Sequence, residues 1–158
     1  MKKNISLRVI YTLAIVITTF FAACSSPTDD HDHEEEEAVG FKVYSATSLG
    51  VPGQLVVEQS LSGVTGNFTI SGELSSYTVV FVSEDGDEFV PDLAEHTIDV
   101  TASENGTNIT ITRPEASVQN MDFGLQGVQG SSAKLTITLK HQGSAEFVSK
   151  ALPVTINF

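Results

Sequence analysis

Short runs of alternating apolar and polar residues fill the chain from Gly40 to Phe158. The clearest is LTITL at Leu135–Leu139, and the residues from Leu152 onward repeat the pattern. Such alternation turns one face of a β-strand toward a core and the other toward solvent. Clusters of Gly, Ser, Asn and Asp separate the runs, and no long helical period interrupts them. The sequence therefore predicts an all-β domain over residues 40–158, an antiparallel β-sandwich of immunoglobulin-like architecture with about eight to ten strands.

The most apolar run, YTVVFV at Tyr77–Val82, is predicted to be a central strand. Two dipeptides, Asp85-Gly86 and Asn105-Gly106, are typical of two-residue hairpin turns because they tolerate positive φ angles. We therefore expect a hairpin at each of them. The second hairpin would pair Thr97–Ala102 with the segment that contains Ile109.

The N-terminal residues have the order of an export signal. Three basic residues come first, an apolar stretch follows, and two alanines end it: Lys2, Lys3 and Arg8, then Val9–Phe21, then Ala22-Ala23. The next residue, Cys24, is the only cysteine of the protein. The apolar segment reaches fifteen residues even when the alanines are included, and a bilayer-spanning helix needs roughly 20. This length disfavours the alternative of an uncleaved membrane anchor.

The tetrapeptide Phe21-Ala22-Ala23-Cys24 resembles the lipobox of bacterial lipoproteins, although Phe21 replaces the usual leucine. In that family the signal peptide is removed, and the cysteine becomes the lipidated first residue. The resemblance implies a signal peptide at 1–23 and a lipid anchor with acyl chains such as palmitate on Cys24. It also implies an outer-membrane or cell-surface location. A tether at 24–39 and the β-sandwich at 40–158 complete the predicted organisation.

Net charge excludes one class of partner. The whole chain carries a formal charge of −12, and loss of the three basic signal residues makes the mature protein more acidic. Nucleic-acid binding needs Lys and Arg to displace counterions from phosphates, so we expect no nucleic-acid partner. An anionic membrane surface would also repel the domain. The expected contact with the membrane is therefore the lipid itself.

The segment Ser25–Glu37, SSPTDDHDHEEEE, is strongly acidic and almost free of apolar residues. Such a segment cannot bury enough surface to offset its ordering entropy, so it is predicted to be a disordered spacer. An acidic run soon after a lipidated cysteine also resembles the surface-export signals of Bacteroidota-type lipoproteins. Here the run begins at Asp29, later than in those signals. Ser25 after the cysteine agrees with an outer-membrane destination.

The same segment is a candidate metal site. Imidazoles interleaved with carboxylates suit Zn²⁺ and other divalent transition metals. The candidate ligands are His31, His33, Asp29, Asp30, Asp32 and Glu34. A free imidazole, with a pKa of about 6.5, is mostly neutral near pH 7 and can coordinate a metal.

The β-domain contains weaker candidates. His96 begins one predicted strand, and His141 ends another, with Glu146 just across the following turn. Both histidines are candidate metal ligands, although a surface histidine usually has no such role. The acidic turn Ser83–Glu88 is a candidate calcium site through Asp85 and Asp87, since Ca²⁺ prefers oxygen ligands. Acidic hairpin tips are more often simply solvated.

Catalytic motifs are missing. Ser131–Lys134 matches S-x-x-K only formally, because it leads into a strand and lacks the companion motifs. We therefore expect a membrane-anchored, non-enzymatic binding or accessory module that captures a Zn-like divalent metal and serves a neighbouring outer-membrane importer or surface protein. The alternative is a surface adhesion or protein- or glycan-interaction module with a plain spacer.

The layout also resembles small bacterial lipoproteins in which a His- and Glu-rich lead-in precedes a single β-domain. The matching elements here are the lead-in His31–Glu37, the hairpin Phe81–Phe89 and the turn His141–Gly143. That resemblance covers most of the mature chain and implies no particular activity.

Overall fold

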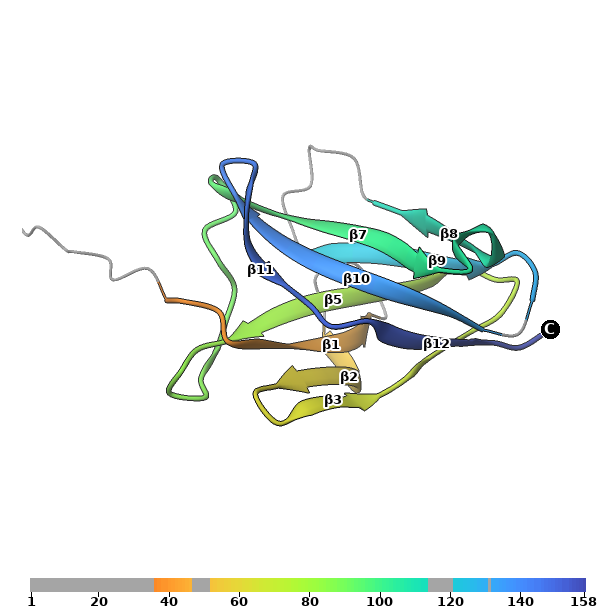
Figure 1. Ribbon diagram of the computed structural model, residues 1–158, viewed down its shortest axis with the longest axis horizontal. Coiled ribbons are helices and arrows are strands. Elements are labelled where there is room, and N and C mark those ends of the chain that lie inside the picture. The colour runs from red at the N-terminus through yellow and green to blue at the C-terminus, as the bar shows by residue number, and fades with distance from the viewer. Residues whose placement is uncertain (1–35, 47–51, 114–120, 131) are drawn as a thin grey trace, which may run out of the picture. The chain divides into compact units, whose positions relative to one another are not determined.

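The computed structural model describes residues 36–46, 52–113, 121–130 and 132–158. Within them, strands form two sheets (Figure 1). The seven strands of the first sheet are β1 (Gly40–Ala46), β2 (Pro52–Ser60), β3 (Gly63–Gly66), β5 (Ser75–Val82), β6 (Glu88–Phe89), β8 (Ile109–Thr112) and β9 (Asp122–Gly127). The five strands of the second sheet are β4 (Phe68–Ile70), β7 (His96–Glu104), β10 (Ser132–His141), β11 (Ser144–Val148) and β12 (Leu152–Ile156).

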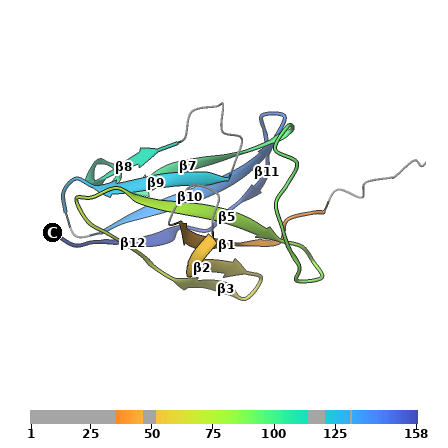
Figure 2. The same cartoon turned by 180° about the vertical axis from the view of Figure 1, so that it is seen from behind.

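The two sheets pack face to face, as the opposite views show (Figures 1 and 2). In Figure 1 the strands β7 and β10 lie in front of β5 and β9, and in Figure 2 this order is reversed. Among the strand pairs of the described residues, β4 with β12 is parallel and the others are antiparallel. The predicted antiparallel β-sandwich is confirmed. No helix among the described residues has the length and apolar character needed to cross a membrane.

The core between the sheets contains two clusters of aromatic rings. In one cluster Phe68 contacts Tyr77 and Phe123, with ring centroids 5.1 and 6.1 Å away. In the other, Phe147 contacts Phe41 and Phe81 at 6.0 and 6.1 Å. Each cluster joins rings from both sheets, because Phe68 and Phe147 belong to the second sheet and the other rings to the first. These contacts hold the layers together without disulfides, since the chain has a single cysteine.

The prediction that Tyr77–Val82 is a central strand is confirmed, since β5 lies between β1 and β9. The hairpin at Asp85-Gly86 forms with a longer loop than expected. Gly86 alone has a positive φ, of 88°, and Ser83 N donates to Asp87 O across the loop at 3.0 Å.

The predicted hairpin at Asn105-Gly106 is wrong. Asn105 does adopt a positive φ, of 50°, but the 3₁₀ turn Gly106–Asn108 follows. That turn carries the chain from one sheet to the other, so β7 pairs with β10 while β8 pairs with β9. The dipeptide supplied the backbone angles of a turn but did not select the partner strand.

Candidate metal site

Two histidines from distant parts of the sequence meet where β7 begins and β10 ends. Antiparallel pairing sets His96 directly opposite His141. The two imidazole rings stack, with centroids 4.5 Å apart and planes inclined by 18°. Both residues lie on the core-facing side of their strands. His96, Ile98 and Val100 are buried in alternation, and His141 continues the alternation of the buried residues in Leu135–Leu139. The histidines are therefore the last cross-strand pair of β7 and β10, on the core-facing side of the second sheet.

A local turn before β7 orients the His96 ring. Asp92 Oδ1 accepts a hydrogen bond from Ala94 N at 2.9 Å. The Asp92 carbonyl accepts two bonds from His96, from the backbone N at 2.8 Å and from Nδ1 at 3.0 Å. Because a carbonyl oxygen only accepts, Nδ1 carries the proton in this arrangement. A neutral His96 then presents Nε2 as its coordinating nitrogen.

His141 is oriented by Glu95. Its Nε2 lies 3.1 Å from Glu95 Oε2, and the backbone N of Gln142 donates to the Glu95 carbonyl at 2.9 Å. An ionised carboxylate only accepts, so Nε2 carries the proton of His141. Of the two His141 nitrogens, Nε2 is thus the one held by Glu95.

A β-bulge brings Glu146 to the pair. The turn between β10 and β11 has two consecutive positive φ angles, 48° at Gln142 and 87° at Gly143. After this turn Lys140 pairs with Ala145, whereas Leu139 pairs with Phe147. Glu146 is thus the extra residue of the bulge, a feature that re-aims a side chain. Its Oε2 lies 3.2 Å from His96 Nε2.

His96, His141 and Glu146 form a three-donor group. One ligand atom from each residue lies within 4.8 Å of the other two. Zinc takes nitrogen and oxygen donors at about 2.0–2.2 Å, so donors that share an ion lie no more than about 4.4 Å apart. Small side-chain rotations would bring these atoms onto one ion. Metal-bound imidazoles typically donate their other N–H to a carbonyl or carboxylate, and Asp92 and Glu95 occupy those two positions.

The structure places the remaining sequence-predicted residues as follows. Cys24 and the tail candidates His31, His33, Asp29, Asp30, Asp32 and Glu34 lie outside the described residues. Asp85 and Asp87 are exposed in the β5–β6 loop and belong to no three-donor group in the described part of the chain. Calcium binding there stays a prediction.

The sequence places Glu146 across a turn from His141, but neither Glu146 nor Glu95 was predicted to contribute to the site. A signal for the histidine pair was available in the alternation. Each histidine stands two residues from a core-facing Ile or Leu, so both histidines share the inward phase of their strands.

Glu88 in the same acidic hairpin is tied to the neighbouring strand β1. Its Oε1 accepts hydrogen bonds from Lys42 Nζ at 2.6 Å and from Tyr44 Oη at 2.9 Å. These bonds, that of Lys42 first, hold the pKa of Glu88 below its ordinary value. Glu88 is thus a structural partner of β1, and this carboxylate is already occupied.

We expect Glu88→Gln to lower the free energy of unfolding at pH 7 by less than about 1 kcal/mol, because the ion pair is partly exposed. A lowered folded-state pKa stabilises the fold above the ordinary value of 4.5, and this contribution is lost as pH falls through the folded-state pKa. The difference in free energy of unfolding between the wild-type protein and Glu88→Gln should therefore shrink on acidification. Urea unfolding at pH 7 and at lower pH measures it.

The matched control is Glu84→Gln, which neutralises an exposed carboxylate of the same hairpin. This control should show no comparable loss of stability at pH 7. A Glu88→Gln deficit that stays constant or grows as the pH falls would contradict the role assigned to the ion pair.

No protein-family model matches the chain, and no curated protein matches it. One solved structure with some likeness is described as domains 4 and 5 of the S-layer protein SbsC, with 15% identity and a TM-score of 0.41. The match covers 58% of this chain and 47% of that one, so it spans about half the length of the S-layer structure. A likeness at this level carries no functional argument.

Proposed function

We propose that this protein is a lipid-anchored, non-enzymatic accessory module of the outer membrane that captures a divalent transition metal of the Zn²⁺ type. The captured ion is bound on the β-sandwich by His96, His141 and Glu146. The acidic tail acts as a tether and as a second, weaker collector of cations. In this role the module holds metal for a neighbouring importer or surface protein.

One observation carries the proposal: one ligand atom from each of His96, His141 and Glu146 lies within 4.8 Å of the other two. His96 is held by the Asp92 carbonyl and His141 by the Glu95 carboxylate. On His96 the coordinating Nε2 faces Glu146 at 3.2 Å. A lone pair and a carboxylate repel each other unless a cation, H⁺ or a metal ion, lies between them. This arrangement therefore favours a bound cation.

Charge supports the choice of a metal cation. The described domain is acidic, and Glu95 and Glu146 border the histidines directly. A divalent cation gains more from this negative surrounding than a monovalent one does. The neighbouring lysine, Lys140, is paired with Asp99 at 2.9 Å, which reduces its repulsion of an incoming cation.

The alternative interpretation is a purely structural role, in which the two hydrogen-bonded histidines cover one end of the hydrophobic core and bind no metal. Calorimetric titration of Zn²⁺ distinguishes the metal site from the structural role. We expect the mature protein, and a variant that lacks residues 29–37, to bind one Zn²⁺ tightly at the sandwich site. The double variant His96→Ala/His141→Ala should lose at least about 100-fold in affinity for that site, since outer-shell partners alone are worth about 10–100-fold.

Fold integrity is checked by thermal unfolding without metal, and His96→Gln/His141→Gln replaces the alanine pair if that pair fails to fold. Glu146→Gln should also weaken binding at this site, and Glu84→Gln, which removes the same charge from the exposed β5–β6 loop, is its control. Unchanged affinity in the double variant would refute the sandwich site. Loss of all binding on deletion of residues 29–37 would assign the metal to the tail alone.

A further inference from the structure

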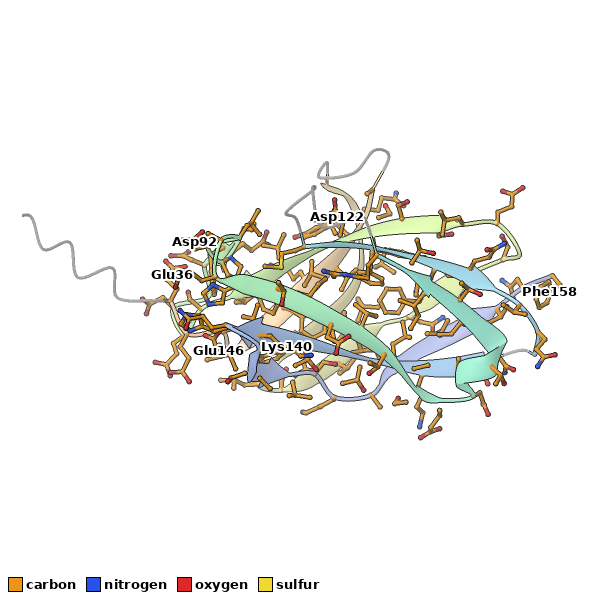
Figure 3. The ribbon with its side chains drawn as sticks, turned by 90° about the horizontal axis from the view of Figure 1, so that it is seen from above. Glu36, Asp92, Asp122, Lys140, Glu146 and Phe158 are labelled. Carbon is orange, nitrogen blue, oxygen red and sulfur yellow. The ribbon has the colours of Figure 1, made fainter. Side chains whose placement is uncertain are left out.

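The three donors of the proposed metal site differ in exposure. The His96 side chain is 8% exposed, whereas those of Glu146 and His141 are 26% and 30% exposed. One imidazole is thus anchored in the core, and the other two ligands lie at its open rim. Figure 3 shows Glu146 and Asp92 at the same end of the domain, opposite Phe158. An ion held by these residues would face solvent on one side.

Three donors leave a transition metal short of its usual shell. Structural zinc sites take four protein ligands, whereas catalytic zinc sites use three and keep the fourth position for water or another exchangeable ligand. Among the described residues, no fourth His, Cys, Asp or Glu joins the three-donor group. Glu95 also contacts this group, but its carboxylate is already bonded to His141 Nε2, at 3.1 Å.

On the basis of the proposed function, we propose that the metal-loaded site keeps one coordination position open for an imidazole from outside the chain, such as a histidine of an acceptor protein. The surrounding charge selects this ligand class. Glu146 and Glu95 offset the two positive charges of a divalent ion, so a further carboxylate or another anion gains little attraction to the loaded site. A neutral imidazole has a lone pair of the right type and does not depend on such attraction. The site is thereby suited to passing a metal ion from one histidine-bearing protein to another.

The test uses the mature protein loaded with Co²⁺, whose visible absorption reports the number and type of its ligands. We expect imidazole to produce a saturable change in the absorption bands. Acetate at equal concentration should produce a much smaller change. A short peptide with one histidine should reproduce the imidazole effect, and the same peptide with alanine should not. Ultrafiltration before and after each addition confirms that Co²⁺ stays on the protein.

The outcomes are distinguishable. Absence of Co²⁺ and Zn²⁺ binding would refute the proposed function and this inference with it. Tight Co²⁺ binding with a spectrum that ignores imidazole would refute the open position while leaving the metal site intact. A response that emerges only after deletion of residues 29–37 would show that the chain supplies its own fourth ligand, which also refutes the inference. Equal responses to imidazole and acetate would refute the selection by charge.

Discussion

Replacing Cys24 with alanine should remove the protein from the membrane and leave it as a soluble or unprocessed form. The acyl chains on the cysteine are the expected source of membrane affinity, at about 0.8 kcal/mol for each buried CH₂ group. The acidic domain offers no compensating attraction to anionic lipids. Detergent-phase partitioning of cell extracts measures the effect, and we expect nearly complete transfer from the detergent phase to the aqueous phase, or retention of the signal peptide.

Ser26→Ala is the matched control, because it changes a small residue two positions after Cys24 without removing the thiol. This variant should partition as the wild-type protein does. If Cys24→Ala is fully processed and still partitions into detergent, the lipobox interpretation fails, and another part of the chain must anchor the protein.

Replacing Phe123 with alanine should destabilise the domain by about 3–5 kcal/mol, the range observed when a buried aromatic residue is truncated. Phe123 is fully buried, and its ring stacks on Tyr77 at 5.5 Å and meets the edge of Phe68 at 6.1 Å. Truncation removes contacts to both sheets and leaves a cavity between them. Since a whole domain is stabilised by only about 5–15 kcal/mol, urea unfolding should show a large fall in the transition midpoint.

Phe158→Ala provides the same chemical change at an exposed position. The Phe158 side chain is 78% exposed, so its truncation should change the free energy of unfolding by about 0.5 kcal/mol or less. Similar losses in the two variants would mean that Phe123 does not have the central packing role described above.

The strands themselves were predictable from local pattern. Leu135, Ile137 and Leu139 alternate with threonines, and the structure buries all three on the inner face of β10. Period-two alternation is a property of neighbouring residues, so it identifies strands and their core faces without reference to the rest of the chain. The partners of those strands were harder to predict. At Asn105-Gly106 the sequence indicated a hairpin, but pairing depends on how two sheets divide the strands between them.

The candidate site shows most clearly which features follow from local sequence and which depend on the tertiary structure. The sequence by itself determined that His96 and His141 stand at strand ends in phase with core residues. It also determined that Glu146 follows a tight turn. Only the tertiary structure decided that β7 and β10 pair with these histidines opposite each other, and that a bulge turns Glu146 toward them. Register between strands about forty residues apart is set by packing of the whole core, and one residue of slip would move every side chain to the other face.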